Sequence, residues 1–141
     1  MLKISKLLDY GLLVVVTIAK NNDTPYSAPK IAEVTDLNLP TVRKLLNLLS
    51  SRNIVESKRG TESGYILTKS AISIKVLDIV KAVEGNVQIT ECCDRRVKDC
   101  ILIKKCTVQN YWRLMNKQVL KILSNTSIED IVKENEINQI N

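Results

Sequence analysis

The four cysteines of this chain, Cys92, Cys93, Cys100 and Cys106, lie within fifteen residues, and the rest of its 141 residues contain none. Three or four thiolates close in space hold a soft metal ion or an iron–sulfur cluster, or form a disulfide switch. The chain has no histidine, which removes the commonest alternative ligand and general base. We therefore expect sulfur to hold any bound metal, completed at most by a carboxylate, an amide or a backbone group.

The cysteine spacing is long and uneven, which suits a cluster or a redox pair better than structural zinc. Structural zinc sites usually contain Cys-x-x-Cys pairs, and none is present. A zinc or thiol–disulfide switch stays open as an alternative. An enzyme is not expected, because the chain lacks a cysteine–histidine pair, a glycine-rich phosphate loop and a paired acidic site.

Composition and charge point to one domain with a polyanionic partner. The net charge is +6 and 45% of the residues are hydrophobic, with no phenylalanine. Such a balance favours nucleic acid or an anionic membrane surface, although a solvated basic surface would give the same total. Basic residues outnumber acidic ones by four in 40–69 and by six in 92–121. In the second segment, cations would also stabilise thiolates.

The apolar run Leu7–Ala19 resembles a secretory signal only superficially. Asp9 interrupts it, and no small-residue cleavage site follows Ala19. It is also shorter than the ~18 apolar residues that a membrane span needs. We interpret it as a core helix and expect a cytoplasmic protein, where structural disulfides are rare.

The elements before the cysteines predict a helix-turn-helix. Apolar spacing predicts a helix over 3–20. Ser27 is suited to cap a second helix with Pro29 in its first turn. After a turn at 36–38, a third helix is predicted over 39–52. Two short helices joined by a tight turn, after a longer one, are typical of this DNA-binding motif.

A β-hairpin and three further helices are predicted after it. The runs 54–59 and 65–69 read as strands joined by a loop with a glycine at each end, the wing of a winged helix. Ser73 is expected to start a helix that ends before Gly85. A long helix is predicted from Val108, with an apolar stripe that favours dimerisation over packing within the chain. The stripe consists of Val108, Tyr111, Trp112, Met115, Val119, Ile122 and Leu123.

The end of the chain is predicted to hold one more helix. Thr126 or Ser127 is suited to cap a short final helix. The polar tail 134–141 is expected to fray.

In the order and spacing of its motifs, the chain resembles the winged-helix iron–sulfur regulators that include IscR, NsrR and the regulators of the SUF cluster-assembly operon. Its N-terminal motif is most like that of the SUF-operon regulators. The motifs that carry the resemblance are Leu2–Gly11, Ser27–Glu33, Leu39–Leu46, Ser57–Gly60 with Gly64–Leu67, and the cysteine block followed by Val108–Trp112. One departure is Ser63, where the family's wing usually has a glycine.

The resemblance implies a mostly α fold with a small β-hairpin, in which a winged helix-turn-helix is followed by a long C-terminal dimerisation helix. It divides the chain into a DNA-binding domain (1–85), a cysteine-rich cluster-binding loop (86–107), and a dimerisation helix with its tail (108–141). It further implies a homodimeric regulator, most often a repressor, that binds a palindromic double-stranded DNA operator. Neither a membrane nor a small-molecule substrate is expected as a partner, and the alternative is an iron–sulfur carrier without a DNA role.

The cofactor implied by the resemblance is a [2Fe–2S] or [4Fe–4S] cluster. Its ligands would be Cys92 or Cys93, together with Cys100 and Cys106. The family's acidic residue before its first cysteine corresponds to Glu91, which favours Cys92 as the first ligand. The other cysteine of the doublet is one candidate for the fourth ligand.

Asp9 is the second candidate for the fourth ligand. Some members of the family use an aspartate at the matching place of the first helix, which reaches the cluster of the partner subunit. The plain alternative is an exposed Asp9 paired with Lys6, because a carboxylate is an unusual ligand for an iron–sulfur cluster. The histidine that some members carry after the last cysteine is Gln109 here.

The residues expected to contact DNA lie on the recognition helix and the wing. Side chains near the start of that helix can reach base edges or phosphates, and an arginine in the wing can reach the minor groove. The expected contacts are Asn38, Pro40, Thr41, Arg43, Lys44, Arg59 and Tyr65.

Overall fold

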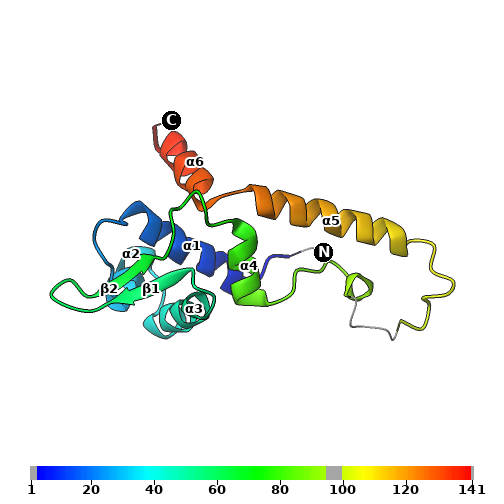
Figure 1. The fold of residues 1–141 in the computed structure, drawn as a ribbon, viewed down its shortest axis with the longest axis horizontal. Helices are drawn as coiled ribbons and strands as arrows, with labels where there is room; N and C mark the ends of the chain where they lie inside the picture. The colour runs from blue at the N-terminus through cyan, green and yellow to red at the C-terminus, as the bar shows by residue number, and fades with distance from the viewer. Residues whose placement is uncertain (1–2, 95–99, 141) are drawn as a thin grey trace.

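The structure is a computed structural model that describes residues 3–94 and 100–140. Most of these residues are helical, and the strands form one antiparallel hairpin (Figure 1), which confirms the predicted fold class. In chain order the elements are α1 (Lys6–Lys20), α2 (Ala28–Thr35), α3 (Leu39–Ser51), β1 (Val55–Lys58), β2 (Gly64–Leu67), α4 (Val76–Glu84), the 3₁₀ helix η1 (Glu91–Cys93), α5 (Gln109–Asn125) and α6 (Ile128–Ile140).

The helix-turn-helix consists of α2 and α3, each begun by a side-chain cap. The Ser27 hydroxyl accepts the Lys30 N–H at 3.3 Å, and the Asn38 Oδ1 accepts the Thr41 N–H at 2.9 Å. Each cap satisfies a backbone donor that has no partner inside its helix. Asp36, with φ of 59°, ends α2 in the left-handed region. The predicted cap at Ser27 is confirmed.

The core of the molecule forms around α1, which is buried on most of its sides. Val14, Val15 and Ile18 are almost fully inaccessible, and α1 packs against α2, α3, α4 and α6. Burying each such side chain contributes about 1.5–3 kcal/mol. The predicted helix 3–20 starts later than expected, at Lys6, so Ile4 lies before it and is exposed. No helix among the described residues is long and apolar enough to cross a bilayer.

The wing is held to the body by a third strand-like segment. β1 and β2 pair with Ser57 opposite Tyr65. On its other side, the Tyr65 N–H donates to the Tyr26 carbonyl at 2.8 Å. A Cβ on Gly64 would lie 2.6 Å from the Tyr26 carbonyl carbon. Only glycine fits at this position, because the two backbones approach so closely.

The prediction that Ser73 starts a helix is wrong: α4 begins at Val76 and ends, as predicted, before Gly85. The segment before it pairs instead with the chain between α5 and α6. The Val76 N–H donates to the Thr126 carbonyl and the Ile128 N–H to the Ile74 carbonyl, both at 2.9 Å. This distant pairing holds the segment out of the helix.

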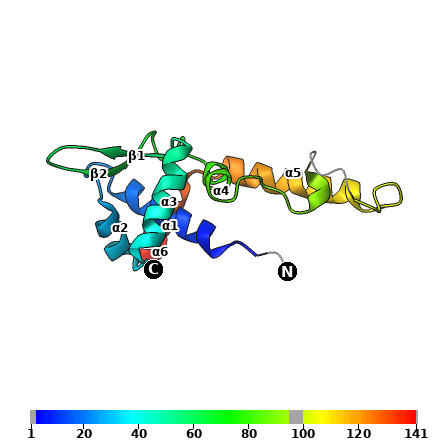
Figure 2. The same cartoon turned by 90° about the horizontal axis from the view of Figure 1, so that it is seen from below.

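The last two helices behave differently from each other. α5 extends away from the body, and none of its residues, all of which are described, is buried (Figures 1 and 2). α6 returns to pack on α1 and is capped by Ser127, whose hydroxyl accepts the Asp130 N–H at 3.1 Å. The tail 134–141 is expected to fray, but α6 continues through it to Ile140, and Asn141 lies outside the described residues.

Candidate DNA-binding surface and cysteine site

The recognition helix α3 divides cleanly into a buried and a basic face. Its buried residues are Val42, Leu45, Leu46 and Leu49. Arg43 and Lys44 are exposed beside them, Pro40 is exposed in the first turn and Thr41 is half-buried. The amphipathic spacing therefore fixes which side chains a DNA groove could meet.

Asn38 stands just before this helix and is exposed. Its Oδ1 is engaged with the backbone of Thr41. The amide NH₂ group is the part of this side chain with donors left for a partner. If Asn38 contacts DNA, its amide NH₂ group would donate a hydrogen bond to a phosphate oxygen or to an acceptor on a base.

The wing supplies the second basic contact. Arg59 is exposed at the start of the loop between β1 and β2, which projects from the body in both views (Figures 1 and 2). Gly60 follows it with φ of 125°. Tyr65 is half-buried, and its backbone joins Tyr26. The Arg59 side chain is thus open to a partner, whereas Tyr65 is held at the wing's base.

The cysteine doublet lies on η1, beside α5. Cys92 and Cys93 are half-buried, and the Thr90 Oγ1 is 3.1 Å from the first sulfur and 3.3 Å from the second. A shallow pocket joins both cysteines to Arg113 and Asn116 of α5. The doublet therefore shares one pocket with a basic and an amide side chain of α5.

A hydrogen bond ties this doublet to the long helix. The Ile89 N–H donates to the Asn116 Oδ1 at 3.0 Å. Sequence reasoning singled out neither Asn116 nor Thr90, because one polar residue on a helix and one hydroxyl before a doublet carry no spacing signal. Their role emerges only from the packing of η1 on α5.

The other candidate ligands lie apart from the doublet. Cys100 is exposed and Cys106 half-buried, and all four thiols are free. Within residues 3–94 and 100–140, no three Cys, Asp or Glu side chains are grouped closely enough to hold a metal ion. Asp9 is exposed on α1. Among the ion pairs of the described residues, none joins Asp9 to Lys6.

In chemistry, this donor set fits an iron–sulfur cluster. Four free thiols and an adjacent arginine provide sulfur ligands and charge compensation. Binding would have to gather the thiols, and ligand gathering is the usual way in which metal binding is coupled to folding.

Comparison with known proteins finds relatives that match most of the chain. The Rrf2 family, described as iron-dependent transcriptional regulators, matches residues 4–134. The regulator IscR of Klebsiella pneumoniae is 29% identical over 91% of this chain and 78% of its own length. NsrR of Oceanobacillus iheyensis is 27% identical over 96% of this chain and 92% of its own.

A solved structure with a similar fold is CymR, named the global cysteine regulator of B. subtilis. It superposes with a TM-score of 0.77 at 28% identity, over 95% of this chain and 98% of that one. The similarity therefore includes the cysteine segment and the C-terminal helices as well as the helix-turn-helix.

Proposed function

The chain belongs to the Rrf2 family of transcriptional regulators, and on this premise we propose that it is a homodimeric repressor controlled by a cysteine-ligated iron–sulfur cluster. Cluster status, or redox or nitric oxide stress that alters the cluster, would set its affinity for operators of iron–sulfur assembly genes. Its relatives are transcriptional regulators by name, which also supports the expectation that it is not an enzyme.

DNA recognition is assigned to α3 and the wing. The first turns of α3 would enter the major groove, with Thr41, Arg43 and Lys44 toward base edges and phosphates. Asn38 and Pro40 would position that end of the helix. Support comes from the exposure of both cations on α3 and from the cap that fixes its start.

The wing would contact DNA mainly through Arg59. Its exposure on a projecting loop suits a minor-groove or phosphate contact. Tyr65 would add a contact at the wing's base. In a dimer, two such surfaces would meet half-sites about one helical turn apart, roughly 34 Å, on a palindromic operator.

Dimerisation is assigned to α5. Leu123 packs on the core of the body, but several other apolar side chains of this helix are exposed, with Tyr111 60% and Ile122 65% exposed. A contiguous apolar surface of this kind marks a protein interface. The proposed division into 1–85, 86–107 and 108–141 follows, with the cluster loop joining the DNA-binding domain to the dimer helix.

The single observation that carries the cofactor proposal is the free cysteine doublet packed on this same helix. Cys92 or Cys93, with Cys100 and Cys106, would hold the cluster, and the doublet's second thiol or the partner's Asp9 would complete it. When bound, the cluster would supply a site that is lost or altered by oxidation. Because η1 contacts α5, a change at the thiols would bias the placement of the two recognition helices.

The test is the visible absorbance of protein purified without oxygen, with iron and acid-labile sulfide assayed on the same sample. Broad absorbance near ~400 nm with matching sulfide would support the cluster. The proposed DNA recognition is tested by selecting the duplexes that the protein binds from a random library. The selected sequences should share a palindrome.

A second candidate is a thiol-disulfide or zinc switch on the same DNA-binding frame. The observation in its favour is the structural similarity to CymR, the global cysteine regulator of B. subtilis. A protein that stays colourless after cluster reconstitution, but whose DNA affinity changes on thiol oxidation or zinc removal, would establish it.

A further inference from the structure

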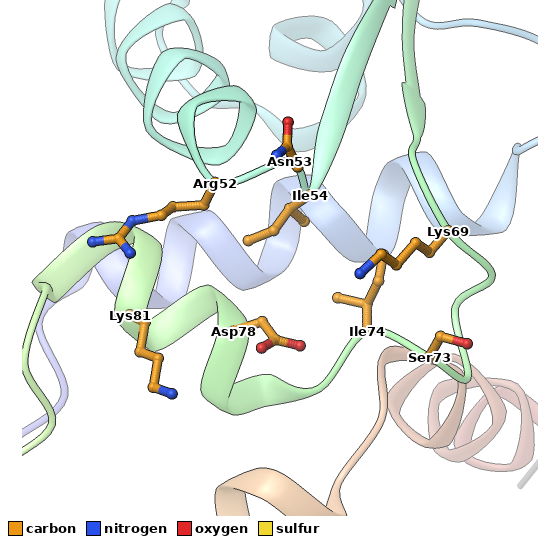
Figure 3. A pocket seen from close by; sticks show the side chains of 8 residues that line it. All are labelled: Arg52, Asn53, Ile54, Lys69, Ser73, Ile74, Asp78 and Lys81. Carbon is orange, nitrogen blue, oxygen red and sulfur yellow. The ribbon is translucent and has the colours of Figure 1, made fainter.

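A hollow at the base of the wing is lined by basic side chains from three separate elements (Figure 3). Arg52 ends α3, Lys69 follows β2 and Lys81 lies on the exposed face of α4. The buried residues Ile54 and Ile74 lie between them. None of the proposed DNA contacts lines this hollow, so the proposed function leaves its cations without a role.

The backbone around the hollow is held by local hydrogen bonds. The Arg52 N–H donates to the Leu49 carbonyl at 3.3 Å, and Asn53 reverses the chain with φ of 55°. The Thr68 N–H donates to the Ile54 carbonyl at 3.1 Å, and its hydroxyl donates to the Asn53 carbonyl. The elements that carry two of the cations are therefore fixed relative to each other.

The charge of this lining is unbalanced. Its only carboxylate among the described residues is Asp78, whose Oδ2 accepts the Lys75 N–H at 2.9 Å at the start of α4. Within residues 3–94 and 100–140, none of the three cations forms an ion pair. Like charges around one hollow repel one another, and an anion between them turns that repulsion into attraction.

We propose that this hollow, formed by Arg52, Lys69 and Lys81, is a phosphate-binding site. A guanidinium donates two parallel hydrogen bonds to a phosphate, and ammonium groups add point charges. Asn53 and Ser73 also line the hollow, and the Ser73 hydroxyl lies 2.9 Å from the Ser70 hydroxyl. The phosphate could belong to a DNA backbone or to a free phosphorylated molecule, and only the first source rests on the proposed function.

The position of the hollow is compatible with a DNA phosphate. α3 has 13 residues and is about 20 Å long, whereas a major groove is about 12 Å wide. If the first turns of α3 reach base edges, its far end lies beyond the groove, where the sugar–phosphate backbone runs. A second hollow shares Arg52 and Lys81 and continues to Gly85 and Gln88, on the way to the cysteine segment.

The test compares the substitutions R52Q, K69Q and K81Q, alone and combined, with K133Q. Lys133 lies on α6, on the opposite side of the body from α3 (Figure 1), so K133Q removes the same charge elsewhere. Affinity for a selected operator and for a random duplex is measured as a function of salt. Separately, melting temperature is followed with inorganic phosphate or pyrophosphate against chloride at equal ionic strength.

A backbone phosphate predicts that each substitution weakens both duplexes equally, by about fivefold, and lowers the salt slope by about one. A free phosphate predicts that phosphate or pyrophosphate raises the melting temperature of the unaltered chain and not of the combined variant. D78N removes the carboxylate from the lining, so it should strengthen the binding of DNA or of free phosphate, whichever the unaltered chain shows. The proposal is overturned if the combined variant matches K133Q in DNA affinity, salt slope and response to phosphate.

Failure of the proposed function and failure of the phosphate site would give different results. If the unaltered chain binds no DNA, the proposed function fails, and the phosphate titration still decides the site. Circular dichroism of each variant checks that the fold is retained, as expected for exposed side chains.

Discussion

The winged-helix body and the extended arm are stabilised in opposite ways. By the body we mean residues 6–85 with α6, and by the arm residues 86–125. In the body, α1 and α3 bury most of their apolar side chains against each other and against α4. In the arm, Ile101 is 98% exposed and Ile122 65% exposed. The body has its own core, whereas the described part of the arm (86–94 and 100–125) leaves large apolar side chains exposed, which the proposed partner subunit or cluster would cover.

The largest expected difference between the two regions is in stability. Leu45→Ala removes a fully buried side chain of the body and should lower the free energy of unfolding by about 2–5 kcal/mol. Leu102→Ala removes an arm side chain that is 66% exposed and should change it by less than about 0.5 kcal/mol. Urea unfolding measures both changes. Equal losses of unfolding free energy would show that the arm side chain is packed as tightly as the body side chain.

The arm's apolar stripe should matter for assembly instead. Ile122→Asp places a charge on the proposed interface, so it should dissociate the dimer and weaken operator binding by about a hundredfold through lost bivalency. The melting of the body should change little. Sedimentation velocity with a DNA titration measures this, and a persistent dimer would remove α5 from the interface.

Within the body, the wing should depend on one glycine more than on another. Gly64→Ala forces a Cβ against the Tyr26 backbone and should cost about 1–3 kcal/mol. Gly60→Ala is the matched control, because its Cβ would meet nothing within 4 Å, although its φ of 125° still disfavours alanine. Thermal melting should therefore rank Gly64→Ala as the less stable variant, and the reverse order would contradict the close approach.

The smallest expected effect is the pH dependence of the α6 cap. The backbone N–H of Ser127, and then its side chain, lower the pKa of Asp130 below its ordinary value of 3.8. A depressed pKa contributes stability above that ordinary value, and the contribution is lost as pH falls through the lower folded-state pKa. The stability difference from Asp130→Asn should therefore shrink below about pH 3.8. A difference that stays constant on acidification would contradict the assignment.

The body could be predicted largely from local signals. Ser27 with Pro29 and the turn before Leu39 mark helix starts that depend on nearby backbone donors alone. Two glycines flanking a short loop predicted the hairpin in the same way. These elements match because each sequence signal and its structural cause lie within a few residues of each other.

Features set by distant partners could not be predicted in this way. Residues 71–76 avoid a helix because they pair with 126–129, some fifty residues later. The last helix, α6, packs on α1 at the other end of the chain. The cysteine spacing predicts the ligand types, but the described residues bring only two thiols together, because a ligand or a second subunit would have to gather the rest.

The proposed control of DNA binding by the thiols of the arm can be tested in one experiment. Operator affinity is measured on anaerobically purified protein before and after air exposure, with absorbance and labile sulfide followed in the same sample, for the unaltered chain and Cys100→Ala. Affinity is expected to change together with cluster absorbance in the unaltered chain, and Cys100→Ala is expected to have neither the cluster nor the response. A Cys100→Ala protein with full cluster absorbance and an unaltered DNA response would contradict it.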